Sequence, residues 1–130
     1  MSEFRKTWPG ELYFVTLTVT GWVDIFTRDV YKDVIIKNLQ YCQEHENLEI
    51  YAYVLMTNHL HMVVRRDNPE KNLTELLGRF KSFTSKKILS LIQENPTESR
   101  KEWLLYLFEY FAATNQPRLC NQSLRWVVKC

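Results

Sequence analysis

Near its N-terminus the chain carries a stretch, LYFVTLTVTG at residues 12–21, in which apolar and polar residues alternate. Alternation with a period of two places the apolar side chains on one face of an extended strand and the polar side chains on the other. The apolar face carries Val15, Leu17 and Val19, and the polar face carries Thr16, Thr18 and Thr20. The stretch therefore predicts a half-buried strand that is closed by Gly21.

A helical period replaces this alternation from about Arg28 to His45, where apolar residues recur three and four positions apart. The apolar stripe consists of Tyr31, Val34, Ile35, Leu39 and Cys42. The stripe predicts an amphipathic helix with one face turned to the core, and Thr27 is a candidate for its N-cap.

Two more strands are predicted by the apolar stretches LEIYAYVLM, at residues 48–56, and HLHMVVRR, at residues 59–66. Only Thr57 and Asn58 separate them, which predicts a tight hairpin, although Thr-Asn is not a favoured turn pair. In such a hairpin the two histidines have these partners: Met56 pairs with His59, and Val54 pairs with His61.

Two helices are predicted in the second half of the chain, at residues 73–93 and at about residues 98–114. The stripe of the first is Leu73, Leu76, Leu77, Phe80, Thr84, Ile88 and Leu91, with Arg79, Ser82 and Lys86 on a polar flank. The second has apolar residues on one face and aromatic residues on the other: Leu104, Leu107, Phe108 and Phe111 opposite Trp103, Tyr106 and Tyr110. Residues 116–130 fit no clear pattern.

The predicted order is strand, helix, strand, strand, helix, helix. Helices mixed with an antiparallel hairpin indicate an α+β fold, with one antiparallel sheet and helices packed on one face of it. A ferredoxin-like arrangement fits this order, but its last strand is missing unless the C-terminal tail supplies it.

Length and composition agree with one soluble domain over residues 1–130, since the chain is 45% hydrophobic and 25% charged. We expect no membrane segment, because no apolar run approaches the roughly 20 residues that a membrane helix needs. The N-terminus has no secretion signal. The three cysteines, Cys42, Cys120 and Cys130, show no metal-binding spacing and indicate free thiols in a cytoplasmic protein.

Charge is distributed unevenly along the chain, although the net charge is only +2. Residues 1–50 hold five basic and eight acidic side chains, whereas residues 65–87 hold seven basic and three acidic ones. A local excess of basic residues is typical of a surface that faces a polyanion such as nucleic acid. A solvated helix face would give the same pattern.

Two histidines, His59 and His61, stand two positions apart within the apolar third strand. Side chains of a strand alternate between faces, so both imidazoles point to the same side, about 6.5–7 Å apart at the Cα atoms. Two neutral ring nitrogens at this spacing can bind one metal ion, which then needs a third ligand and keeps open positions for a substrate oxygen. Two surface histidines that bind no metal would give the same sequence pattern. The length excludes an amidohydrolase barrel, which needs about 250 residues, and the two long helical stripes exclude an all-strand cupin.

VLMTNHLHMVVR, followed by LTELLGRFKSFTSKKI, resembles the HUH single-tyrosine transposases, in particular the REP-associated tyrosine transposases and their insertion-sequence relatives. The opening strand, YFVTLTVTGW, and the helix after it are also similar to that family, so the resemblance covers about residues 8–95. One departure is Thr57, where proline is usual, and we expect it to alter turn rigidity more than metal binding.

The resemblance implies a DNA transposase that cleaves single-stranded or hairpin DNA with metal assistance and transfers strands through a phosphotyrosine intermediate. It implies His59 and His61 as ligands of Mg²⁺ or Mn²⁺, and a homodimer. The residues that it places on the DNA backbone are Arg65, Arg66, Lys71, Arg79 and Lys86.

The family's tyrosine helix has no counterpart in residues 116–130, so we expect a domain that is shortened or altered after about residue 115, a change that would leave the chain inactive. Tyr110 is the candidate nucleophile on the helix before it. Two other functions remain open: a non-catalytic ferredoxin-like nucleic-acid-binding domain, and a metal-dependent phosphodiesterase that uses water in place of tyrosine.

Overall fold

A computed structural model describes residues 7–19, 21, 23–115 and 126–129 of the chain, with side chains described no further than Tyr110. Four strands form one sheet: β1 (Leu12–Val19), β2 (Leu48–Leu55), β3 (His59–Arg66) and β4 (Trp126–Lys129). Three helices and one short 3₁₀ turn complete the described elements: α1 (Asp29–His45), α2 (Leu73–Glu94), α3 (Lys101–Asn115) and η2 (Ile25–Thr27).

The strands are ordered β2-β3-β1-β4, and every neighbouring pair is antiparallel. This is the ferredoxin-like order, in which β3 lies between two strands that run parallel to each other, and α3 is added between α2 and β4. The predicted α+β fold is confirmed. The tail does supply the last strand, because residues 126–129 pair with β1 in the register Thr16 to Lys129.

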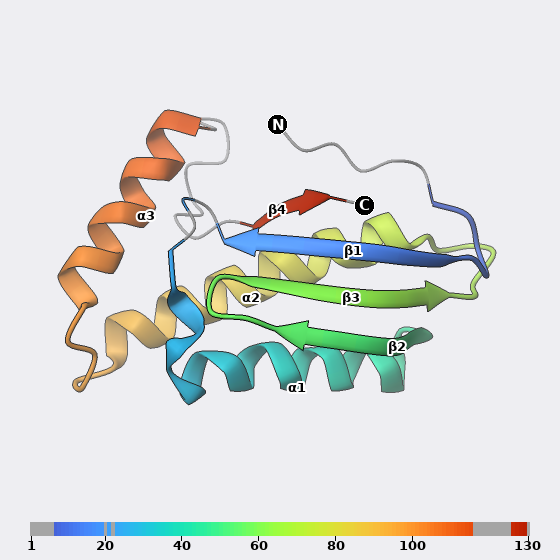
Figure 1. The fold of residues 1–130 in the computed structure, drawn as a ribbon, viewed down its shortest axis with the longest axis horizontal. Helices are drawn as coiled ribbons and strands as arrows, with labels where there is room; N and C mark the ends of the chain where they lie inside the picture. The colour runs from blue at the N-terminus through green and yellow to red at the C-terminus, as the bar shows by residue number, and fades with distance from the viewer. Residues whose placement is uncertain (1–6, 20, 22, 116–125, 130) are drawn as a thin grey trace.

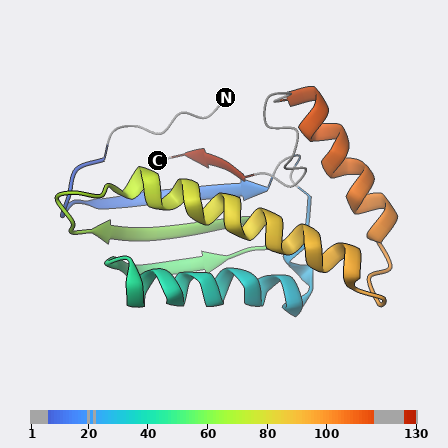
Figure 2. The same ribbon diagram turned by 180° about the vertical axis from the view of Figure 1, so that it is seen from behind.

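Helices α1 and α2 cover one face of the sheet and leave the other face open (Figures 1 and 2). The covered face carries every second residue of β1 and β3, as the alternation predicts. The apolar positions that β1 and β3 bury are Val15, Leu17, Val19, Leu60, Met62 and Val64. The helices bury the predicted stripes against them, except that α2 buries Ile92 in place of Leu91. Full burial of one such side chain favours folding by about 1.5–3 kcal/mol, so this layer holds the sheet and the two helices together.

The helix starts are capped differently. Helix α2 begins after Asn72, whose side chain accepts a hydrogen bond of 2.8 Å from the backbone N–H of Glu75. Helix α1 begins at Asp29, so the N-cap position belongs to Arg28, and no side chain caps it. The prediction of Thr27 as the N-cap was wrong, because η2 occupies residues 25–27 and shifts the start of the helix.

In the described part of the chain, no helix is both long enough and apolar enough to cross a bilayer. Cys42 is buried on α1, and burial raises the pKa of its thiol to about 11, so it is a core residue. Cys120 and Cys130 lie outside the described residues.

Candidate active site on the open face of the sheet

His59 and His61 stand on the open face of the sheet, at the start of β3. Their neighbours along the strand, Leu60 and Met62, are buried under the helices, so the alternation turns both imidazoles outward. The hairpin has the predicted register, with Val54 opposite His61, and its turn is closed by a hydrogen bond of 2.8 Å from the N–H of Met56 to the carbonyl of His59.

The two rings face each other closely, with centroids 4.6 Å apart and planes at 76°. Nδ1 of His59 donates a hydrogen bond of 2.6 Å to the side-chain oxygen of Asn58, and Nδ1 of His61 lies 2.9 Å from the hydroxyl of Thr16 on β1. Among the described residues, no hydrogen bond engages Nε2 of either ring. A partner on one ring nitrogen fixes the tautomer and orientation of the ring, which prepares the other nitrogen for a ligand.

This arrangement fits a divalent metal ion as a partial ligand set. Two imidazole nitrogens fixed in one orientation are suitable donors for such an ion. No cluster of three or more His, Cys, Asp or Glu side chains that could hold a metal occurs within the described residues. The remaining coordination positions would therefore belong to water or to oxygens of a substrate, which is the open arrangement that a catalytic ion needs.

Backbone and side-chain bonds fix the hairpin turn that carries the histidines. The N–H of Val19, at the end of β1, donates to the carbonyl of Asn58 over 2.9 Å, and the N–H of Phe26 in η2 donates to the carbonyl of Thr57 over 2.8 Å. The Thr57 hydroxyl donates a hydrogen bond of 2.8 Å to the carboxylate of Asp24. The side chain of Thr57 therefore anchors the hairpin turn to the segment before η2.

Further polar contacts connect the segment that holds the hairpin turn to the start of α3. Arg100, which immediately precedes α3, donates a hydrogen bond of 2.9 Å to the carbonyl of Asp24 and contacts the carboxylate of Glu98 at 3.3 Å. The Glu98 carboxylate is fully buried and also contacts Arg28 at 3.0 Å and the hydroxyl of Tyr31 at 2.9 Å. A continuous polar path thus joins the histidine hairpin, the start of α1 and the start of α3.

Helix α3 carries the predicted nucleophile, Tyr110, on a side chain that is 51% exposed. Trp103 and Tyr106 are also exposed, whereas Leu104 and Phe108 are fully buried, so the two predicted faces of this helix are confirmed at those positions. The helix lies at the end of the sheet where β1 ends and β3 begins, as both ribbon views show (Figures 1 and 2). His59, His61 and helix α3 therefore lie at the same end of the molecule.

The five predicted DNA-binding residues do not form one surface. Arg65 lies on the open face, near the end of β3 that is remote from the histidines, and its guanidinium is paired with Glu49 at 3.3 Å and Asp67 at 3.4 Å. Lys71 and Lys86 are exposed, the first in the loop before α2 and the second on α2, and neither makes an ion pair with a described residue.

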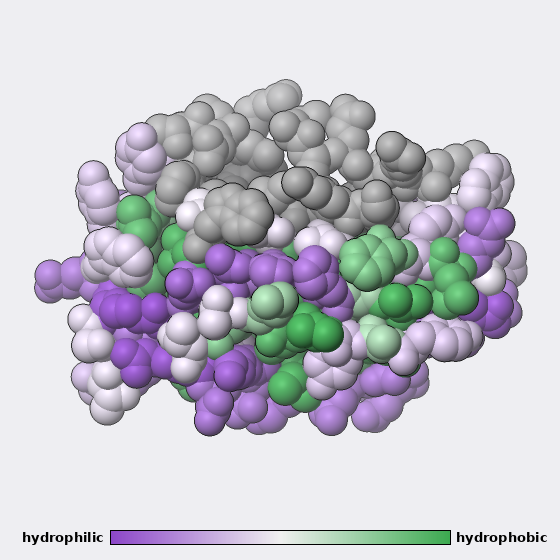
Figure 3. Space-filling view, in the orientation of Figure 1, coloured by the Kyte–Doolittle hydropathy of each residue, from purple (hydrophilic) through white to green (hydrophobic). Residues whose placement is uncertain are grey.

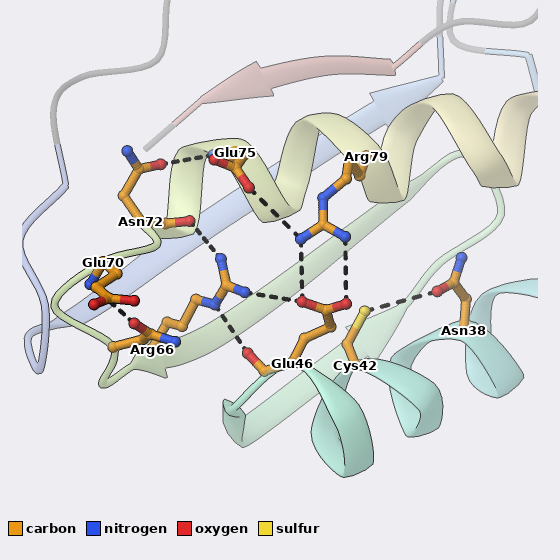
Figure 4. A network of polar contacts seen from close by, with 9 residues as sticks. Asn38, Cys42, Glu46, Arg66, Glu70, Asn72, Glu75 and Arg79 are labelled. Carbon is orange, nitrogen blue, oxygen red and sulfur yellow. Dashed lines mark hydrogen bonds and ion pairs between the residues drawn. The ribbon is translucent and has the colours of Figure 1, made fainter.

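Arg66 and Arg79 both bind the carboxylate of Glu46, the residue that directly follows α1 (Figure 4). Arg66 is 3% exposed and donates to the carboxylate of Glu46 at 3.0 Å and to the carbonyls of Glu46 and Asn72 at 2.9 and 2.8 Å. Arg79 donates to the same carboxylate at 3.1 Å, and this hydrogen bond lowers the pKa of Glu46. Arg66 is thus a structural residue here, and the prediction that it contacts DNA disagrees with its burial.

Sequence analysis missed Thr16 and Asn58, the two residues that orient the histidines. Thr16 was assigned correctly to the polar face of its strand, but its pairing with His61 depends on a register between strands 45 positions apart. Asn58 precedes His59 directly, and a short polar side chain beside a candidate ligand was the signal that could have identified it.

Comparisons with known proteins identify the family of the chain and support its fold. A family model described as "Transposase IS200 like" matches residues 13–125 of the chain. A solved structure from Deinococcus radiodurans R1, of a protein provisionally described as a transposase, superposes with a TM-score of 0.54 at 15% identity, over 72% of this chain and 71% of that one. At this identity the structural match shows the fold alone. No curated protein matches the chain.

Proposed function

The chain belongs to the IS200-like transposase family, and we propose that it cuts and rejoins single-stranded or hairpin DNA through a covalent phosphotyrosine intermediate. One observation supports this function above the others. Two imidazoles stand 4.6 Å apart on the open face of the sheet, and each has its Nδ1 bonded to a neighbouring side chain.

In the proposed reaction a tyrosine hydroxyl oxygen attacks the scissile phosphorus and loses its proton. The bond from phosphorus to the 3′ oxygen breaks, so one strand end carries a 5′-phosphotyrosine and the other a free 3′-OH. Attack of a 3′-OH on that phosphotyrosine restores a phosphodiester and frees the tyrosine. Mg²⁺ or Mn²⁺, when bound, would polarise the phosphate oxygens.

The residues of this chain have distinct parts in the proposal. His59 and His61 would hold the ion through Nε2, while Thr16 and Asn58 keep the rings in place from the other nitrogen. Tyr110 is the proposed nucleophile, because it is 51% exposed on α3, at the end of the sheet that carries the histidines. Binding of the DNA backbone needs positive charge more than a fixed geometry, and for it we retain three of the five residues: Arg65, Lys71 and Lys86.

We include a homodimer in the proposal. The outer face of α3 exposes Trp103 and Tyr106, at 53% and 66%, next to Tyr110. Adjacent large aromatic residues in solvent are typical of a surface that binds a partner, and a second copy would allow the α3 of one subunit to serve the histidines of the other.

Incubation with a labelled DNA hairpin and Mn²⁺, followed by denaturing electrophoresis, tests the reaction. A covalent protein–DNA adduct supports the proposal, free cleaved ends indicate a phosphodiesterase that uses water, and a native gel shift without cleavage indicates a binding domain. The double variant His59→Ala with His61→Ala should lose all metal-dependent cleavage and keep its fold by circular dichroism. Unfolding of this variant would instead indicate that the histidines are structural.

Two tyrosines of one helix face provide a matched pair of variants for the nucleophile. Tyr110→Phe should abolish the adduct, whereas Tyr106→Phe, which removes a hydroxyl from a similarly exposed ring, should leave it. An adduct that survives Tyr110→Phe would assign the nucleophile to another residue.

A further inference from the structure

Phe14 interrupts the polar side of β1 on the open face of the sheet. The positions that follow it on this side are threonines, Thr16 and Thr18, yet the Phe14 ring is 58% exposed. Full burial of a phenylalanine side chain favours folding by about 1.5–3 kcal/mol. The exposed ring of Phe14 forgoes most of this stabilisation, so it contributes little to stability. Exposed aromatic rings of this kind are frequent in binding sites.

The ring stands beside the candidate metal ligands. Its centroid is 5.6 Å from that of His61, with 34° between the planes, and Phe14 is the diagonal neighbour of His61 across the β1–β3 pair. Leu12 is exposed two positions before Phe14 on β1, and Val54 is exposed on β2, opposite His61. In the space-filling view of this face, apolar side chains lie among the hydrophilic ones over these strands (Figure 3).

The arginine on this part of the open face is already paired with carboxylates. Arg65, the arginine of β3 on this face, lies opposite Leu12 and is already paired with Glu49 and Asp67. Among the side chains described up to Tyr110, a DNA strand that reaches the histidines from this direction therefore meets aromatic and aliphatic groups. Unpaired bases bind such groups by stacking on aromatic rings, without regard to their sequence.

We propose that Phe14 is the stacking platform for an unpaired nucleobase next to the scissile phosphate, and so positions the strand over His59 and His61. This inference rests on the proposed function, because it assumes that single-stranded DNA occupies the open face. It adds a base-binding subsite, so that recognition of the strand depends on its bases as well as on its phosphates.

Two fluorescein-labelled 20-mers with the same phosphates test the subsite: oligothymidylate, and a strand of abasic tetrahydrofuran nucleotides. Fluorescence anisotropy gives the affinity for each. The wild-type protein should bind oligothymidylate more tightly by about 5- to 100-fold, as expected for base stacking. Phe14→Leu should reduce that ratio at least fivefold and leave binding of the abasic strand unchanged, whereas Phe14→Trp should restore it.

Phe83→Leu is the control variant, since Phe83 is 57% exposed and lies on α2, on the opposite side of the sheet. It should keep the wild-type ratio. If Phe14→Leu also keeps that ratio while the wild-type protein binds and cleaves DNA, the stacking role is wrong and the proposed function stands. If the wild-type protein binds neither strand, both are wrong.

Discussion

Replacement of Glu98 by glutamine should destabilise the protein by about 3 kcal/mol at pH 7. The Glu98 carboxylate is fully buried between Arg28 and Arg100, and it accepts a hydrogen bond from Tyr31. Burial opposes its charge, but hydrogen bonds from the backbone and side chain of Arg100 and from Tyr31 outweigh burial and lower the pKa of Glu98 from 4.5 to about 2.

The magnitude follows from that pKa difference. Each unit of pKa corresponds to about 1.4 kcal/mol, so a pKa that falls from 4.5 to about 2 favours folding by about 3 kcal/mol. Loss of one partner from a buried ion pair destabilises proteins by about 3–5 kcal/mol. The lower end applies here, because the side chains of Arg28 and Arg100 are 37% and 25% exposed and retain some solvation after the change.

The pH dependence separates this explanation from a simple packing defect. A carboxylate whose pKa is lowered by folding stabilises the protein above its unfolded pKa, and this stability is lost as the pH falls from about 4.5 to about 2. Urea unfolding, followed by circular dichroism at several pH values, should therefore show a difference between wild type and Glu98→Gln that is largest at pH 7 and declines below pH 4.5.

The exposed ion pair of Glu49 with Arg65 supplies the control. Glu49→Gln should change stability little at any pH, since exposed pairs contribute weakly. A difference between Glu98→Gln and wild type that stays constant from pH 7 to pH 2.5 would refute the assigned role of the charge.

Two further predictions concern the site and the arginines. Thr16→Val should weaken Mn²⁺ binding by about 10- to 100-fold in isothermal titration calorimetry, because the His61 ring loses its Nδ1 partner; an unchanged affinity would remove Thr16 from the site. Arg66→Met should lower stability by about 3 kcal/mol, because the carboxylate of Glu46 keeps only Arg79 as a donor and the carbonyls of Glu46 and Asn72 lose the guanidinium, with little effect on DNA affinity below the melting temperature. Arg65→Gln should leave stability unchanged and reduce the salt dependence of DNA binding. Equal behaviour of Arg65→Gln and Arg66→Met would contradict the different placement of the two arginines.

Periodicity was sufficient to predict most of this fold. The alternation in β1 and β3 and the helical stripes of α1 and α2 reflect which side of each element is buried, and burial is the property that a sequence records most directly. Placement of His59 and His61 on the open face follows from the same rule. Strand β4 could not be predicted, because WVVK is short and lacks alternation, and its pairing depends on the free edge of β1.

Electrostatic partners were not predictable in the same way. The basic excess over residues 65–87 was counted within one segment, but its arginines pair with Glu46 and Glu49, which lie 16 to 33 positions earlier in the chain. Only the fold brings α1 and β2 beside β3 and α2. A local charge count therefore overestimated the positive charge that is available to DNA, and two of the five predicted residues are instead bound to Glu46.

The pairing of these arginines changes how the open face can select DNA. Long-range attraction to phosphates is left mainly to lysines such as Lys71 and Lys86, which lie off the sheet, while the face around His61 presents Phe14 and aliphatic side chains. Charge contacts act equally on single-stranded and double-stranded DNA, whereas stacking on an exposed ring requires a base that is unpaired. Because the ring adjoins the histidines, a paired duplex could approach the protein but would gain no contact of this kind at the cleavage position. If the proposed function and the proposed stacking are right, apolar contact favours single-stranded segments at His59 and His61, and this preference should persist in salt that weakens overall DNA binding.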